Sequence, residues 1–160
     1  MSRKCSLTTQ TGKIFLVIRK NKKIDKNMIA AYLKEYAIDY AFIEHEKDIE
    51  PVTGLVEGVH YHIVYNAKDK RMRLATILNN VVSYFGFKDS NGIEIEKYTS
   101  FELSIQYLIH KNNPEKTQHK PEEIISNIDK DLLNTYLTCD MEVLSFDYIY
   151  SLCNSNSTIL

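Results

Sequence analysis

The sequence has 160 residues, of which 44% are hydrophobic and 26% are charged, so it can bury one substantial core but is short for two. No apolar run approaches the roughly 20 residues that cross a bilayer, and the first residues carry no apolar signal segment, which favours the cytoplasm. The net charge of −1 does not by itself indicate a nucleic-acid partner, and the three cysteines indicate reduced thiols and not a disulfide framework.

Strands and helices are expected to alternate along the first half of the chain. Consecutive apolar residues indicate a buried strand, and apolar residues three or four apart after a capping side chain indicate a helix. The expected elements are a strand at residues 14–19, a helix from the cap Asp25 to about residue 37, a strand at residues 39–45 and a polar loop at residues 46–57.

The second half continues the alternation. Its expected elements are a strand from about residue 60, a helix at residues 71–85 that Gly86 stops, a strand at residues 93–97, and a helix that begins with the capping box Thr99-Ser100-Phe101-Glu102. The order β-α-β-β-α-β is typical of the ferredoxin-like split arrangement. We therefore predict an α+β fold in which a central antiparallel sheet is packed against helices.

Two histidines, His60 and His62, stand two positions apart inside an otherwise apolar strand. Residues i and i+2 of a strand point to the same face of a sheet, so both imidazoles can bind one metal ion while Tyr61 and Ile63 enter the core. A pair of this kind also arises in strands by accident, and it needs partners to carry a function. The chain offers His45 and Asp48 before the pair, and Tyr107 and His110 after it.

His45 or Asp48 would complete a ligand set with the two strand histidines and leave coordination positions open for phosphate oxygens and water. Neutral nitrogens with a carboxylate and without a thiolate suit Mn²⁺ and tolerate Mg²⁺. Zn²⁺ stays open as an alternative, since it accepts three histidines. Taken alone, His45 and Asp48 are better explained as the end of a strand and the cap of a loop.

Tyr107 is the candidate nucleophile beside this metal site. A free phenol is protonated at neutral pH and needs activation, and His110 and Lys111 follow it at i+3 and i+4, on one side of the predicted helix. Attack of the phenol on a phosphodiester would leave a covalent phosphotyrosine. Any one of eleven tyrosines is more often a packing residue, and a lone His110 is more often a helix-end cation. His119 has no comparable context, and we assign it to the surface.

The small net charge hides an uneven distribution. Residues 1–120 carry 19 basic and 14 acidic side chains, whereas residues 121–160 carry 1 and 7. Clustered cations neutralise phosphates and release counterions, so we predict DNA contacts at two clusters. Solvated loop charges explain either cluster alone about as well. The predicted DNA-binding residues are Lys20, Lys22 and Lys23 after the first strand, and Lys68, Lys70, Arg71 and Arg73 after the histidine strand.

Three motifs together resemble a known family. His60-Tyr61-His62, the upstream His45-Glu46-Lys47-Asp48 and the downstream Tyr107-Leu108-Ile109-His110 stand in an order and at spacings similar to those of plasmid-type rolling-circle replication initiators of the histidine-hydrophobic-histidine (HUH) endonuclease superfamily. The resemblance implies an origin-nicking endonuclease domain at residues 12–125.

The resemblance also implies a reaction and its partners. Tyr107 would join the 5′ phosphate of the nicked strand and free a 3′ hydroxyl that primes synthesis, and the same site would rejoin strands. The implied substrate is single-stranded or hairpin-extruded DNA at a replication origin, and a host helicase and polymerase are implied as further partners. Two other functions stay open: a DNA-binding regulator or mobile-element protein without turnover, and a metal-binding inhibitory protein.

Residues 126–160 are predicted to form an acidic helical tail. Pro121-Glu122-Glu123 is a good helix start, and residues 132–137 and 143–150 carry apolar stripes. These stripes are expected to pack on the nuclease core. The alternative is a surface for a partner or for self-association.

Overall fold

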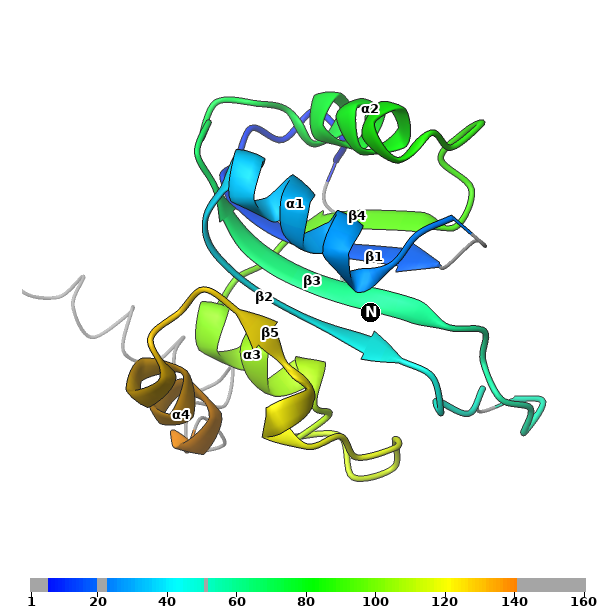
Figure 1. Ribbon diagram of the computed structural model, residues 1–160, viewed down its shortest axis with the longest axis vertical. Helices are drawn as coiled ribbons and strands as arrows, with labels where there is room; N and C mark the ends of the chain where they lie inside the picture. Colours follow the sequence, from blue (N-terminus) through cyan, green and yellow to red (C-terminus); the bar gives the residue numbers. More distant parts are fainter. Residues whose placement is uncertain (1–5, 20–22, 51, 141–160) are drawn as a thin grey trace, which may run out of the picture.

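A computed structural model describes residues 6–19, 23–50 and 52–140 of the chain, and these residues form one antiparallel sheet flanked by helices (Figure 1). The strands lie in the order β4-β1-β3-β2-β5. The strands are β1 (Lys13–Arg19), β2 (Ala37–His45), β3 (His60–Ala67), β4 (Ile93–Lys97) and β5 (Ile125–Ser126). The helices are α1 (Lys26–Tyr36), α2 (Leu74–Phe85), α3 (Phe101–Leu108) and α4 (Lys130–Thr138), with a 3₁₀ turn at Pro121–Glu123.

The predicted α+β fold with the ferredoxin-like order is confirmed. Helix α1 connects β1 to β2, helix α2 connects β3 to β4, and each of these four strands is antiparallel to its neighbours in the sheet. Helices α1 and α2 lie on one face of the sheet, and α3 and α4 lie on the other (Figure 1). In the described residues no helix is long and apolar enough to cross a membrane.

Capping side chains set the helix ends close to their predicted places. The Asp25 carboxylate accepts a hydrogen bond from the Met28 amide at 2.9 Å, and Gly86 ends α2 in the left-handed conformation with φ 70°. The capping box at Thr99 is wrong by one residue, because Ser100 is the cap and its hydroxyl accepts from the Leu103 amide at 3.2 Å. Helix α2 begins at Leu74, three residues later than predicted.

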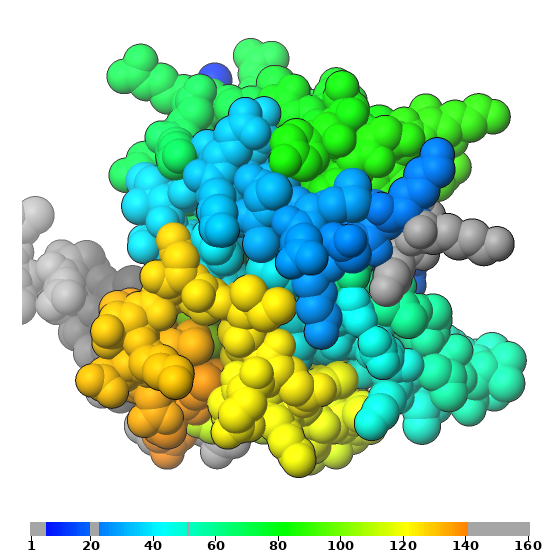
Figure 2. Space-filling model, viewed as in Figure 1, coloured from blue at the N-terminus to red at the C-terminus, as the bar shows by residue number. Residues whose placement is uncertain are grey.

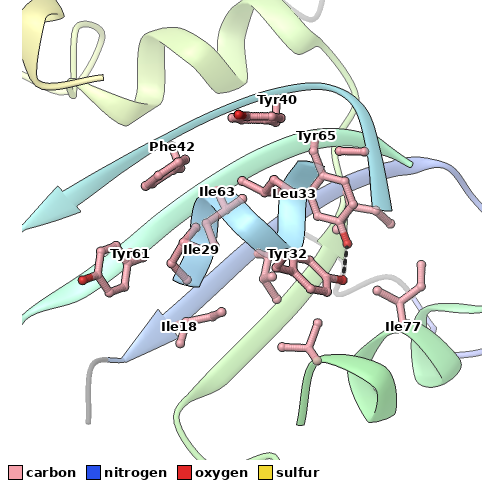
Figure 3. Close-up of a cluster of buried hydrophobic side chains, with 14 of the residues drawn as sticks. Ile18, Ile29, Tyr32, Leu33, Tyr40, Phe42, Tyr61, Ile63, Tyr65 and Ile77 are labelled. Atoms are coloured by element: carbon pink, nitrogen blue, oxygen red, sulfur yellow. Dashed lines mark hydrogen bonds between the residues drawn. The ribbon is translucent and has the colours of Figure 1, made fainter. Parts of the chain in front are cut away.

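The core beneath α1 and α2 is rich in aliphatic and tyrosine side chains (Figure 3). Tyr61 and Ile63 of β3 are fully buried there, as the strand alternation predicts. The hydroxyls of Tyr32 and Tyr65 are 3.1 Å apart and bond to each other, so two buried phenols satisfy their polar ends. Each fully buried side chain of this size contributes about 1.5–3 kcal/mol to folding.

The opposite face of the sheet carries a smaller core that ends in polar side chains. Phe15, Val17 and Val64 pack against Ile105 and Leu108 of α3. The same alternation that buries Tyr61 on the first face directs His60 and His62 to this second face. The histidine pair is therefore on the side of the sheet that α3 covers, and α3 carries Tyr107.

The chain after residue 120 departs from the prediction of a helix at Pro121. Only a 3₁₀ turn forms there, and the next residues form β5, which pairs with β2. The predicted boundary between residues 125 and 126 thus falls inside β5. Helix α4 packs on α3 with Leu133, Tyr136 and Leu137, while Leu132 of the predicted stripe is 44% exposed. The second stripe, residues 143–150, lies outside the described residues.

Candidate metal centre and nucleophile

Three histidines meet where β2 ends and β3 begins. His45 is the last residue of β2 and lies directly opposite His60, the first residue of β3, while His62 lies opposite Ile43. One ring nitrogen from each of these histidines lies within 4.8 Å of the others. The structure therefore brings together His45, His60 and His62, as the sequence predicted.

Backbone carbonyls fix the orientation of two of these rings. His45 Nε2 lies 2.7 Å from the Leu108 carbonyl oxygen, and His60 Nδ1 lies 2.8 Å from the Gly58 carbonyl oxygen. A carbonyl oxygen only accepts, so each of these nitrogens carries the hydrogen. The lone pairs are left on His45 Nδ1 and His60 Nε2, which is the arrangement that metal-binding histidines have when a second partner orients them.

Two ring nitrogens in this cluster receive no hydrogen bond. Nδ1 of His45 and Nδ1 of His62 are both buried without a hydrogen-bond partner. His45 Nδ1 faces the Asp48 carboxylate oxygen Oδ2 at 2.9 Å, so two acceptors meet there. A cation between them would satisfy both, and this is the direct structural reason why the residues fit a divalent metal ion.

Burial keeps these imidazoles uncharged. It lowers the pKa of His45 to about 4 and lowers the pKa of His62 well below its ordinary value, and neighbouring histidines add to the shift at His62. At neutral pH a metal ion would not have to displace a proton from either ring. Their lone pairs are therefore available as ligands.

Asp48, the acidic member of the predicted ligand set, lies beside His45 and His60. Its Oδ2 is 3.4 Å from His60 Nε2, and its Oδ1 is 3.0 Å from His119 Nε2. Burial alone would raise the pKa of Asp48, but the hydrogen bond from His119 and the nearby histidines outweigh it, so this pKa is below its ordinary value. The carboxylate is charged and points one oxygen at the histidine cluster.

The assignment of His119 to the surface is wrong. Its side chain is 5% exposed, and its ring stacks on His45 with centroids 4.1 Å apart and planes 6° from parallel. Figure 2 shows the segment after α3 (yellow) beside the cyan segment that holds β2. His119 was missed because it comes from this irregular segment, which has no periodicity from which a side-chain direction can be predicted.

Glu57 is a second acidic neighbour that the sequence did not single out. Its Oε2 lies 3.7 Å from His60 Nε2, and the two form a possible ligand group with Asp48. Asp48 and Glu57 stand at the base of the loop between β2 and β3, where the Glu57 amide donates to the Asp48 carbonyl at 2.6 Å. The loop that was predicted only as polar therefore closes on the site.

Tyr107 lies next to the histidines near the end of α3. The centroid of its ring is 5.7 Å from that of His62 and 5.4 Å from that of His110. Its hydroxyl accepts a hydrogen bond from Lys116 Nζ at 2.7 Å, and Lys116 Nζ is 4.9 Å from the ring centroid. The phenol is thus held between the histidine cluster and an ammonium group.

The placement of Lys111 beside the phenol is wrong, because α3 ends at Leu108. His110 adopts a left-handed backbone with φ 57°, which redirects the chain before Lys111. Lys111 Nζ instead donates to the Leu137 carbonyl at 2.7 Å and to the Cys139 carbonyl at 3.2 Å, at the end of α4. Lys116 occupies the place that the sequence gave to Lys111 by helical spacing.

His110 stays at the site although it lies outside the helix. Its Nδ1 donates to the Thr117 carbonyl at 2.7 Å, so its Nε2 carries a lone pair, and that nitrogen is 4.0 Å from Asp48 Oδ2. Burial lowers the pKa of His110 below its ordinary value. A neutral imidazole therefore stands between Asp48 and Tyr107.

The predicted DNA-binding cations fall at opposite ends of the sheet. Lys23 is exposed near the end of β1, next to the histidine end of β3, while Lys20 and Lys22 lie outside the described residues. The other predicted cations are Lys68, Lys70, Arg71 and Arg73, which are exposed after the far end of β3. Six residues of extended strand separate His62 from Lys68, which is roughly 20 Å.

A comparison with protein families finds that residues 8–132 match the family described as plasmid replication protein, origin binding domain. The match includes both motif histidines, the upstream His45 and Asp48, and Tyr107. A search of curated proteins finds no match.

Proposed function

This chain belongs to the family of plasmid replication protein origin-binding domains, and DNA at a replication origin is its partner; from this premise we propose that it also nicks one strand of that DNA, with Tyr107 as the nucleophile. The observation that carries the proposal is the contact of the Tyr107 hydroxyl with Lys116, on the same face of the sheet as three histidines with two orphaned ring nitrogens.

His45, Asp48, His60 and His62 would hold a divalent ion in the proposed site. Three neutral nitrogens and one carboxylate without a thiolate favour Mn²⁺, and Mg²⁺ is tolerated. When bound, such an ion acts as a Lewis acid that offsets charge on a phosphate oxygen. The Nδ1 atoms of His45 and His62, which are buried and have no hydrogen-bond partner, support this role.

The protein's own groups supply the nucleophile and handle its proton. In the proposed step the Tyr107 oxygen forms a bond to phosphorus, the bond from phosphorus to the 3′ oxygen breaks, and the 3′ oxygen takes up a proton from solvent water. Lys116 has only donors, so it stabilises the phenolate and does not take the phenol proton. We assign that proton to the lone pair on His110 Nε2.

The phosphotyrosine formed in this step keeps the energy of the broken diester, so attack by a 3′ hydroxyl reverses it. The same site would therefore nick and rejoin strands. The released 3′ hydroxyl is the group a host polymerase extends, and a helicase would supply further single strand. Because the phenol and the ligands are recessed, the strand must be single or extruded from a hairpin to reach them.

The test is incubation of the purified protein with end-labelled single-stranded origin DNA and Mn²⁺. A covalent adduct that survives denaturing electrophoresis supports nicking. Binding without an adduct would identify a regulator without turnover. Absence of both would leave a metal-binding protein with incidental cations and would overturn the proposal.

We predict that Lys116→Ala slows adduct formation by about 100-fold, the usual cost of removing one hydrogen-bond donor from a developing oxyanion. Lys116→Arg, which keeps a cationic donor, should recover part of the rate. Lys111→Ala is the matched control: it removes a lysine five residues away whose ammonium group bonds to α4, and it should leave the rate near that of the wild type. Equal rates for Lys116→Ala and the wild type in single-turnover assays would refute this role.

His119 is predicted to position Asp48 for the ion. His119→Ala removes the hydrogen bond to Asp48 Oδ1 and should weaken Mn²⁺ affinity by about 10- to 100-fold, the typical effect of losing an outer partner of a ligand. His119→Gln keeps a donor and should recover part of the affinity. Free Mn²⁺ measured by electron paramagnetic resonance gives the affinity, and melting of the metal-free variants reports any loss of fold. Unchanged Mn²⁺ affinity in His119→Ala would contradict the prediction.

A further inference from the structure

A groove of about 1390 Å³ leads away from the proposed nicking site. It is lined by His62 and Tyr107 at one end and continues over β1 and β4. Helix α3 lies mainly over β3 and β2, so the parts of β1 and β4 that it does not cover form the floor of the groove. A strand of DNA that reaches Tyr107 can therefore continue across β1 toward β4.

Two carboxylates stand on the β4 side of this groove. The strand register places Glu94 opposite Val17, which is itself opposite His62, and places Glu96 opposite Phe15. Adjacent strands are about 4.8 Å apart, so the backbone of Glu94 lies roughly 10 Å from that of His62 across one small side chain. Both glutamates are exposed, and both line the groove.

The charge of the lining is unexpected for a DNA groove. Its cations are Arg19, Lys97 and Lys116, and its carboxylates are Asp48, Glu57, Glu94, Glu96 and Glu115. Asp48 lies in the proposed ligand set, but Glu94 and Glu96 are too far from it to share an ion. A carboxylate repels phosphates but accepts hydrogen bonds from base N–H groups, so Glu94 and Glu96 favour the bases of a bound strand, while Arg19, Lys97 and Lys116 favour its phosphates.

We propose that Glu94 and Glu96 read the bases of the nicked strand and select bases that carry an amino group. Cytosine, adenine and guanine each offer an exocyclic N–H that a carboxylate accepts, whereas thymine places two carbonyl oxygens around its one N–H. Glutamates two residues apart on one strand are about 6.6 Å apart, a spacing that fits successive bases of an extended single strand. The inference rests on the proposed function for the identity of the strand.

Arg19 forms an exposed ion pair with one of these carboxylates. Its Nη2 lies 3.7 Å from Glu94 Oε1, and both side chains are more than half exposed. Arg19 is also directly opposite His60 in the β1–β3 register. The Arg19–Glu94 pair thus joins the histidine end of the groove to its β4 wall.

The test measures equilibrium binding of homopolymeric single-stranded DNA to Tyr107→Phe protein in Mn²⁺, by fluorescence anisotropy. The background protein should bind oligo-dC and oligo-dA about 5-fold or more tightly than oligo-dT. A second protein carries Glu94→Gln and Glu96→Gln in addition to Tyr107→Phe. It should bind oligo-dT more tightly than the Tyr107→Phe protein does, because a glutamine amide both donates and accepts hydrogen bonds. Its preference for oligo-dC and oligo-dA over oligo-dT should fall to within about twofold. Glu35→Gln removes the same charge from α1, on the other face of the sheet, and should change neither quantity.

Each outcome decides the inference. If the double variant gains affinity for all three polymers by the same factor, the glutamates only repel phosphates and base reading is refuted. Absence of a preference in the background protein, or of any single-strand binding, refutes it as well. This binding assay does not depend on nicking. A base preference that requires the glutamates would therefore support base reading even if no adduct forms. An adduct without any base preference would support the proposed function and refute base reading.

Discussion

Tyr107→Phe is expected to abolish the covalent protein–DNA adduct while changing the affinity for single-stranded DNA by less than about twofold. The substitution removes only the hydroxyl that accepts from Lys116 and leaves the ring packed near Phe15, His62 and His110. Without the nucleophilic oxygen no phosphotyrosine can form, so adduct formation should fall by at least about 1000-fold. Denaturing electrophoresis of end-labelled DNA measures the adduct, and anisotropy measures binding.

The matched control for this variant is Tyr36→Phe. Tyr36 lies on α1, on the opposite face of the sheet, and 38% of it is exposed. It should form adduct at the wild-type rate. Persistent adduct in Tyr107→Phe would show that another side chain attacks the phosphate, and the proposed mechanism would then be wrong.

His60→Ala or His62→Ala is expected to abolish cleavage and to weaken DNA binding only modestly. Each substitution removes one of the nitrogens that meet within 4.8 Å of His45, so Mn²⁺ affinity should fall by at least about 100-fold and cleavage should fall with it. Binding of duplex origin DNA should fall by less than about 5-fold, because phosphate contacts supply most of such affinity and the cations after β3 lie roughly 20 Å away.

The reciprocal control changes those distant cations. A triple variant, Lys70→Ala with Arg71→Ala and Arg73→Ala, should keep the Mn²⁺ affinity of the wild type, lose duplex affinity and show a shallower dependence of binding on salt. Thermal melting of each metal-free variant shows whether it folds. Equal loss of cleavage and binding in His60→Ala and His62→Ala, together with a lower melting temperature, would mean that these histidines hold the fold and not the ion.

The sheet was predictable because its strands follow simple periodicity. Alternation within β3 was enough to assign Tyr61 to the core and His62 to the opposite face, and both assignments are confirmed. Gly86 marked the end of α2 because a residue with positive φ ends a helix at little cost when it is glycine. The segment after Pro121 was predicted wrongly since pairing with β2, a strand some 80 residues earlier, overrides local helix signals.

Periodicity could predict the site only where its residues lie on regular elements, whereas Asp48 and His110 were predicted from their motifs. His45, His60 and His62 come from strand ends whose register the fold fixes, and Tyr107 comes from the last turn of α3. Lys116 and His119 come from an irregular segment, and helical spacing pointed to Lys111 instead because nothing local indicates that the chain turns at His110. A histidine with φ 57° has no distinctive local sequence pattern.

That irregular segment links the two halves of the candidate site. Between His110 and His119 it supplies both the ammonium group on the phenol and the imidazole on the Asp48 carboxylate, and it is tied down by the His119 amide, which donates to the Ile109 carbonyl at 3.3 Å. Detachment of this segment would remove the hydrogen bond to the Tyr107 hydroxyl and the hydrogen bond to the Asp48 carboxylate at the same time. In the proposed mechanism, loss of this one segment would therefore remove the support of the nucleophile and of the ion together.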